Sequence, residues 1–327
     1  MWRGAAPFAA VLVLLSHGAH AAPGGPQRYL IVPFENLSSE RSLNWIGEAL
    51  AMSLADRFEL LGMRTVTRSE RLEALDDMVL PSGAPLTLAS DLKLAGAVRA
   101  GRLVAGTYDF DPNNGVVVTA RLVDVKAGAQ LWEGSRPGTL AGIFSLMDPV
   151  VLQAAASDEA RVSAVAPSDL SSISDPPLPL YEVIVRGVQE SDPDRRVAAL
   201  EKGLEMNSKA PALLRALAFT LYDAGRLDDA LSRLDAIPEG SAADGWRLFL
   251  LRARILLARN DTNGALSALS RSVAAGESAD AHVLLALIHA RRGERTRAQS
   301  ELDLASGFDP GHPEIPEVKA LLSGTPL

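Results

Sequence analysis

The sequence predicts two domains of different fold class: an α/β domain with a mixed sheet and flanking helices at residues 27–157, and an all-α superhelical solenoid at residues 180–324. Three observations lead to this division. Short apolar runs alternate with helical periodicity in the first half. Helix-length segments recur at a nearly fixed spacing in the second half. The stretch 158–179 between them is rich in proline and serine, which predicts an extended linker.

The first 21 residues have the layout of a secretory signal peptide. Arg3 supplies a positive charge, residues 7–15 are apolar, and Ala19-His20-Ala21 fits the small-x-small cleavage rule. An apolar run of about nine residues is too short to span a bilayer, which takes about 20. We therefore expect cleavage after Ala21 and an exported protein, periplasmic or secreted, with no stable membrane insertion. An uncleaved membrane anchor is the alternative.

The elements of the α/β domain follow from periodicity and turn residues. The apolar run 29–34 is typical of a strand buried on both faces. Leucines and other apolar residues recur at steps of three and four over 43–61, which predicts a helix ended by Gly62. Asn114-Gly115 predicts a hairpin turn. In sum, strands are expected at 29–34, 63–67, 102–110, 116–125 and 130–134, and helices at 43–62, 69–78, 86–100 and 140–156.

Five segments of this domain form a recognisable set. They read VPFENLS at 32–38, WIGEAL at 45–50, VTRS at 66–69, VAGTY at 104–108 and ARLVDVKAGAQLW at 120–132. In this order they resemble the TolB N-terminal-like domain. The resemblance covers residues 28–135 and implies a bacterial envelope module without established catalytic residues. The insertion between Pro81 and Pro85 departs from the usual shorter connection of that family.

The second half resembles tetratricopeptide (TPR) repeats. Equivalent positions recur with offsets of 35 and then 33 residues, which is the TPR period. Small residues at these positions let paired helices approach closely: Ala218, Ala253 and Ala286 on the first helix, and Ala230, Ala265 and Ala298 on the second. The turns carry Gly225, Asn260 and Gly293, which tolerate a left-handed backbone. A degenerate repeat at 180–204 and a capping helix at 314–322 complete a stack that can bury a continuous core.

Composition excludes several function classes. The net charge of −8 argues against a nucleic-acid-binding protein, which needs a basic surface. With no cysteine in the chain, disulfides, zinc-thiolate sites, iron–sulfur clusters and cysteine nucleophiles are excluded. His282 and His289 lie seven positions apart on one expected helix, about 10 Å along its axis, too far to share a metal ion. No catalytic motif is found, so we expect no enzyme activity, no cofactor and no metal site.

One set of residues is a candidate partner-binding surface. In the TPR geometry the first helix of each repeat lines a concave groove, and arginine and aromatic side chains there suit acidic side chains or a peptide carboxylate. The predicted residues are Arg215, Phe219, Tyr222, Arg247, Arg254 and Arg291. The alternative is that these arginines only reflect a composition in which arginine far outnumbers lysine.

These observations favour an exported envelope scaffold or adaptor that binds protein or peptide partners and has no catalysis. Two alternatives remain. The chain could be an accessory component of a cell-wall or carbohydrate-active system, although no paired carboxylates stand in a recognisable context. It could also be the periplasmic partner of a signalling system, because domains of this kind are often fused to signalling domains.

Overall fold

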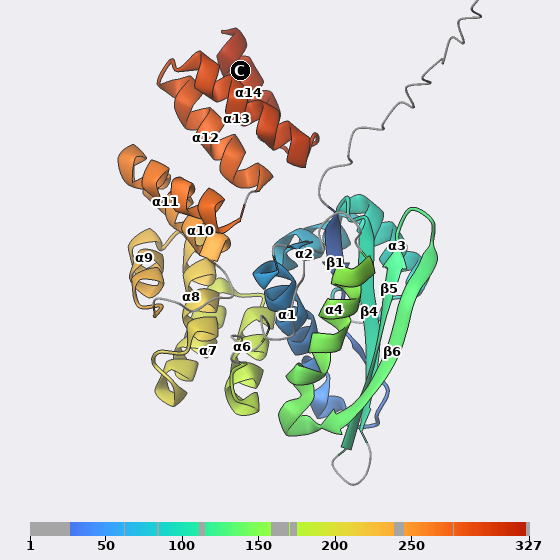
Figure 1. The fold of residues 1–327 in the computed structure, drawn as a ribbon. Helices are drawn as coiled ribbons and strands as arrows, with labels where there is room; N and C mark the ends of the chain where they lie inside the picture. The colour runs from blue at the N-terminus through green and yellow to red at the C-terminus, as the bar shows by residue number, and fades with distance from the viewer. Residues whose placement is uncertain are drawn as a thin grey trace, which may run out of the picture.

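The computed structural model describes residues 27–61, 63–83, 85–110, 115–157, 170, 175–238, 245–276 and 278–324. The predicted signal peptide, the Gly62 helix end, Asn114 of the hairpin turn and most of the 158–179 linker lie outside the described residues. Figure 1 shows a sheet with helices against it, and further helices that run beside α1 and on to the C-terminus.

The N-terminal half is built on one mixed sheet, as predicted. Its strand order is β3-β1-β4-β5-β6, and β2 pairs with β4 off this path. The pairs among β1, β2, β3 and β4 are parallel, whereas β4, β5 and β6 form an antiparallel meander. The strands are β1 (Arg28–Ile31), β2 (Glu35–Asn36), β3 (Arg64–Thr65), β4 (Arg102–Phe110), β5 (Gly115–Asp124) and β6 (Ala129–Thr139).

Helices cover both faces of this sheet. Tyr29 and Ile31 of β1 point into one buried cluster, which also contains α1 and α4, while Leu30 and Val32 point into a second cluster under α2 and α3. This alternation along β1 follows from the two-residue period of a strand. The helices are η1 (Arg41–Leu43), α1 (Trp45–Leu60), α2 (Arg68–Asp77), α3 (Leu88–Ala97), η2 (Leu140–Met147) and α4 (Asp148–Ser157).

Several elements differ from the sequence prediction. The strand expected at 29–34 ends at Ile31, before Pro33, which has no N–H to donate to the ladder, and the short strand β2 follows it. The strand expected at 63–67 is reduced to β3, and the helix expected at 86–100 is the shorter α3. β6 continues to Thr139 instead of ending at 134. The helix expected at 140–156 begins as the 3₁₀ helix η2, which is distorted at Gly142, and α4 starts only at Asp148.

The C-terminal half consists of paired helices closed by one more helix. The pairs are α6 (Leu178–Gln189) with α7 (Pro193–Met206), α8 (Pro211–Asp223) with α9 (Leu227–Asp235), α10 (Gly245–Ala258) with α11 (Thr262–Ala275), and α12 (Ala279–Arg291) with α13 (Arg295–Phe308), followed by α14 (Ile315–Ser323).

The repeat positions predicted from the sequence have the expected structure. The six small residues at the helix contacts, Ala218, Ala230, Ala253, Ala265, Ala286 and Ala298, are fully buried. The turns at Gly225, Asn260 and Gly293 have positive φ values of 73°, 61° and 75°. Small side chains allow the paired helices to pack closely, and glycine or asparagine allows the tight turn between them.

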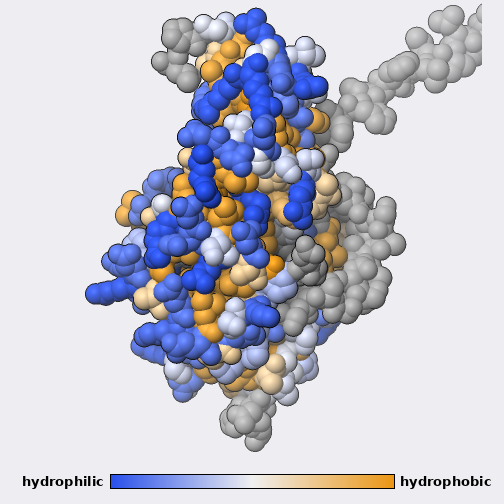
Figure 2. All heavy atoms as spheres, turned by 90° about the vertical axis from the view of Figure 1, so that its left-hand side faces the viewer, coloured by the Kyte–Doolittle hydropathy of each residue, from blue (hydrophilic) through white to orange (hydrophobic). Residues whose placement is uncertain are grey.

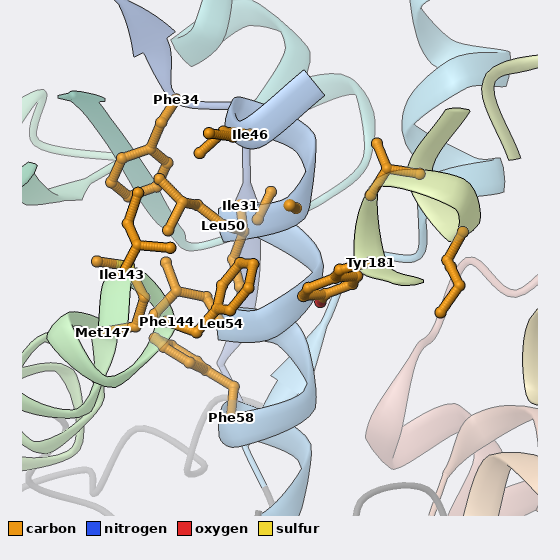
Figure 3. Packing of buried hydrophobic residues seen from close by; sticks show 14 of the residues in the cluster. Ile31, Phe34, Ile46, Leu50, Leu54, Phe58, Ile143, Phe144, Met147 and Tyr181 are labelled. Carbon is orange, nitrogen blue, oxygen red and sulfur yellow. The ribbon is translucent and has the colours of Figure 1, made fainter. Parts of the chain in front are cut away.

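The apolar core of the sheet continues into the repeats. Leu50 and Leu54 of α1 share a buried cluster with Tyr181 and Ile184 of α6. The ring of Tyr181 lies 4.5 Å from that of Phe144 of η2. Figure 3 shows the side chains of η2 and α6 gathered around α1. Helix α1 is therefore covered by the sheet and η2 on one side and by the first repeat helix on another.

Candidate protein-interaction site

Helices α8 and α10 turn charged side chains toward α1. Arg215 of α8 forms an ion pair with Asp56 of α1 at 2.8 Å. Arg247 of α10 forms one with Glu59 of α1, also at 2.8 Å. We call the surface of α8 and α10 that carries Arg215, Trp246 and Arg247 the inner face. The inner face is in contact with the α/β domain of the same chain.

Glu59 is the centre of the polar contact. Its Oε1 accepts hydrogen bonds from Arg247, from the backbone N–H of Thr65 and from the Thr65 hydroxyl, at 2.7 to 2.9 Å. Its Oε2 accepts one from the indole N–H of Trp246 at 2.6 Å. Only 3% of the Glu59 side chain is exposed. A buried carboxylate needs such partners, because burial without them would cost several kcal/mol.

A second buried charge fixes α1 to the segments that lead into the repeats. The Arg57 side chain is 3% exposed and binds Asp148 at the start of α4 and Asp175 just before α6, each at 2.7 Å. Burial alone would lower the pKa of Arg57, but the hydrogen bonds and charges of Asp175 and Asp148 outweigh burial and raise it. Arg57 therefore stays charged and joins three parts of the chain.

The last repeat also contacts the α/β domain through charged groups. Arg64 of β3 lies over the ring of Phe308, 4.2 Å from its centroid, and Arg99 pairs with Asp309 at 3.1 Å. Near this contact, Asp280 of α12 pairs with Arg254 at 2.8 Å. Burial would raise the pKa of Asp280, but a hydrogen bond from His312 and the charge of Arg254 lower it to about 2.

The six residues predicted to bind a partner fall into three places. Arg215 and Arg247 contact α1, as described. Phe219 and Tyr222 are half-buried and pack against the main apolar cluster. Arg254 pairs with Asp280 inside the repeats, and the exposed Arg291 pairs with Glu317 of α14 at 3.1 Å. The structure thus brings Arg215 and Arg247 to one helix and leaves Arg291 apart from them. That these six residues bind a partner stays a prediction.

Sequence reasoning missed the α1 side of the contact and Trp246. Asp56 and Glu59 lie three positions apart on a helix that was predicted, so their sharing of one helix face could be predicted, whereas their partners on α8 and α10 could not. Figure 2, which views the molecule from the side of the repeats, shows hydrophilic residues across the outer surface with hydrophobic ones between them.

His282 and His289, which are too far apart to share a metal ion, each have a carboxylate partner. His282 Nδ1 lies 2.7 Å from Glu301, and His289 Nδ1 lies 2.8 Å from Glu294. Within the described ranges, no group of three or more histidine, aspartate and glutamate side chains is arranged to hold a metal ion. None of the helices in these ranges combines the length and the apolarity needed to cross a membrane.

The helix pairs also have a counterpart among known families. Residues 188–255 match the tetratricopeptide repeat family. The match runs from the end of α6 into α10 and so includes most of the inner face. The family match and the helix pairs both support TPR repeats in this part of the chain. The resemblance of the first half to the TolB N-terminal-like domain stays a prediction.

Three solved structures each resemble part of the chain. The C-terminal domain of LpoB from Salmonella enterica has 17% identity, covering 36% of this chain and 84% of that one, with a TM-score of 0.30. MamA has 21% identity, covering 45% and 84%, with a TM-score of 0.38. YrrB, described as a TPR protein with an unusual peptide-binding site, has 19% identity, covering 48% and 80%, with a TM-score of 0.38. TM-scores this low do not support any inference about function. No curated protein matches the chain.

Proposed function

We propose that this protein is an exported adaptor of the bacterial cell envelope that binds protein partners through its TPR repeats and catalyses no reaction. The inner face is the observation that carries this proposal. Arg215, Trp246 and Arg247 hold two carboxylates that are three positions apart on one helix. A surface with this chemistry suits an acidic peptide segment, because guanidinium and indole N–H groups donate directionally to carboxylates.

The exported location rests on the N-terminal sequence, with its positive charge, short apolar run and Ala19-His20-Ala21 cleavage site. The envelope location also rests on the resemblance to the TolB N-terminal-like domain at 28–135. Export and the envelope location are both parts of the proposal. N-terminal sequencing of the protein recovered from a periplasmic fraction should begin at Ala22, and intact Met1 in the cytoplasmic fraction would contradict export.

Cross-linking in intact cells followed by affinity capture tests the adaptor function. We expect capture of a defined protein partner, reduced when Arg215 or Arg247 of the inner face is replaced by alanine. These side chains are 16% and 18% exposed, so circular dichroism of each variant checks that the fold is kept. The matched control replaces Arg136 of β6, an exposed arginine outside the repeats. Equal capture by both variants, the control and the unmodified protein would place the partner surface outside the inner face.

A further inference from the structure

The repeats contact the α/β domain in two physically different ways. At α6 the contact is apolar, because Leu180, Tyr181 and Ile184 are buried in the cluster that also contains Leu50 and Leu54 of α1. From α8 onward the described contacts to α1 are hydrogen bonds and ion pairs, from Arg215 to Asp56 and from Trp246 and Arg247 to Glu59. Apolar residues of α8 and α10, such as Leu217 and Leu251, belong to the same buried cluster as α6. Breaking an apolar contact exposes its surface to water, whereas a charged contact can be exchanged for an equivalent one.

The later repeats have apolar cores of their own. Leu250 and Ala253 of α10 are buried with residues of α11 and α12, and Val283 and Leu287 of α12 are buried with α13 and α14. These helices therefore keep most of their buried apolar surface when their charged contacts to α1 and β3 are broken. The apolar contact at α6 remains in place.

The repeats bind Asp56 and Glu59 in the way that they would bind an acidic ligand. Both carboxylates stand on the same side of α1, three positions apart, and arginines from two successive repeats meet them. Glu59 is also held by the Trp246 indole. The Arg215 and Arg247 side chains are 16% and 18% exposed, so water and ions reach the edge of the contact.

We propose that α1 is a built-in acidic ligand of the inner face, and that a partner helix with carboxylates at positions i and i+3 competes with α1 for Arg215, Trp246 and Arg247. This proposal rests on the proposed adaptor function and names the partner chemistry. Only molecules in which α1 has released the inner face can bind the partner. The apparent affinity for the partner is therefore lowered in proportion to the fraction of such molecules. Weakening α1 as a ligand therefore strengthens partner binding.

Two substitutions separate this proposal from a purely structural contact. Glu59→Gln and Arg247→Ala both remove the Arg247–Glu59 ion pair, but only Glu59→Gln keeps the arginine that a partner needs. The probe is a fluorescein-labelled, C-terminally amidated alanine–glutamine helical peptide whose only side-chain carboxylates are Asp and Glu at i and i+3. The control probe has Asn and Gln there. Fluorescence anisotropy with the purified full chain gives each Kd.

We expect Glu59→Gln to bind the acidic probe at least fivefold more tightly than the unmodified protein, within the 5- to 150-fold range typical of coupled sites. Arg247→Ala should bind it no better than the unmodified protein. The control probe should bind none of them. Equal affinities for the unmodified protein and Glu59→Gln would overturn the proposal, and so would equal gains in both variants.

A distance measurement provides the second readout. The chain has no cysteine, so Lys93→Cys on α3 and Ser300→Cys on α13, both exposed, allow two spin labels without further changes. We expect Glu59→Gln and Arg247→Ala to add a longer-distance population that is minor in the parent. An unchanged distance distribution in both variants would also overturn the proposal.

Asp56→Asn provides a check on folding, because its oxygen can still accept a hydrogen bond from Arg215. Asp56→Asn should shift the Kd in the same direction as Glu59→Gln, by a smaller factor, while circular dichroism stays that of the parent. Capture of a cellular partner that Glu59→Gln and Asp56→Asn leave unchanged would overturn the competition and leave the adaptor function standing. Failure to capture any partner contradicts the adaptor function itself.

Discussion

Removing Arg57 should destabilise the protein more than removing any exposed arginine. Its guanidinium binds Asp148 through Nε, Asp175 through both terminal nitrogens, and the carbonyl and hydroxyl of Ser53. Arg57→Met keeps the apolar stem and deletes the charge. Breaking a buried ion pair by removing one partner typically costs 3–5 kcal/mol. Asp148 and Asp175 are 37% and 21% exposed and regain some hydration, so we expect a loss of about 3 kcal/mol.

Urea titration followed by circular dichroism measures this loss, as a lower midpoint with an unchanged slope. The control is Arg226→Ala, whose pair with Asp229 is 45% and 53% exposed and lies within one helical turn. That control should cost about 0–1 kcal/mol. Similar losses for Arg57→Met and Arg226→Ala would refute the reasoning that the buried charge holds α1, α4 and the approach to α6 together.

Three further predictions concern single positions. Burial raises the pKa of Asp91 to about 6 from 3.8, so its ionisation destabilises the folded state as the pH rises from about 4 to 6. Asp91→Asn should raise the free energy of unfolding at pH 7 by up to about 3 kcal/mol and leave it unchanged at pH 3, as measured by urea titration at both pH values. Gly293→Ala, at φ 75°, should cost about 1 kcal/mol, whereas Asn260→Gly, at φ 61°, should change thermal stability by less than about 0.5 kcal/mol. Gly47→Ala should cost about 3 kcal/mol in thermal unfolding, because its Cβ would overlap the Phe34 carbonyl; a cost near zero would contradict the close approach of α1 to that carbonyl.

The repeats could be predicted almost residue by residue, because each constraint is local. Ala218 must be small where two neighbouring helices touch, and Gly225 must allow a left-handed turn a few residues later. Both requirements recur one period on, at Ala253 and Asn260. The mixed sheet was equally accessible, since the apolar run at β1 and the hairpin of β4 and β5 depend on short-range patterns.

The ends of strands and helices that were predicted incorrectly are those set by tertiary contacts. The continuation of β6 to Thr139 depends on pairing with Gly115 across the sheet, and its own sequence contains Pro137 and Gly138, which oppose a strand. The α1 side of the candidate site was not predicted, for a similar reason. Arg215 and Arg247 were identified as residues that bind acids, but the acids they bind in the structure are Asp56 and Glu59. Pairing over such sequence distances is not encoded in any local period.

The Glu59–Arg247 contact joins positions that are 188 residues apart in the chain. During synthesis α1 emerges early, and Arg247 and Trp246 are added only after the first two helix pairs of the repeats. Glu59 therefore has no partner in the repeats until that point. Closing so long a loop carries an entropic cost and slows the step that forms it. The sheet and the first repeat can assemble around α1 before then. The inner-face contact is consequently among the later contacts to form. The contact of Arg64 with Phe308 closes a longer loop still.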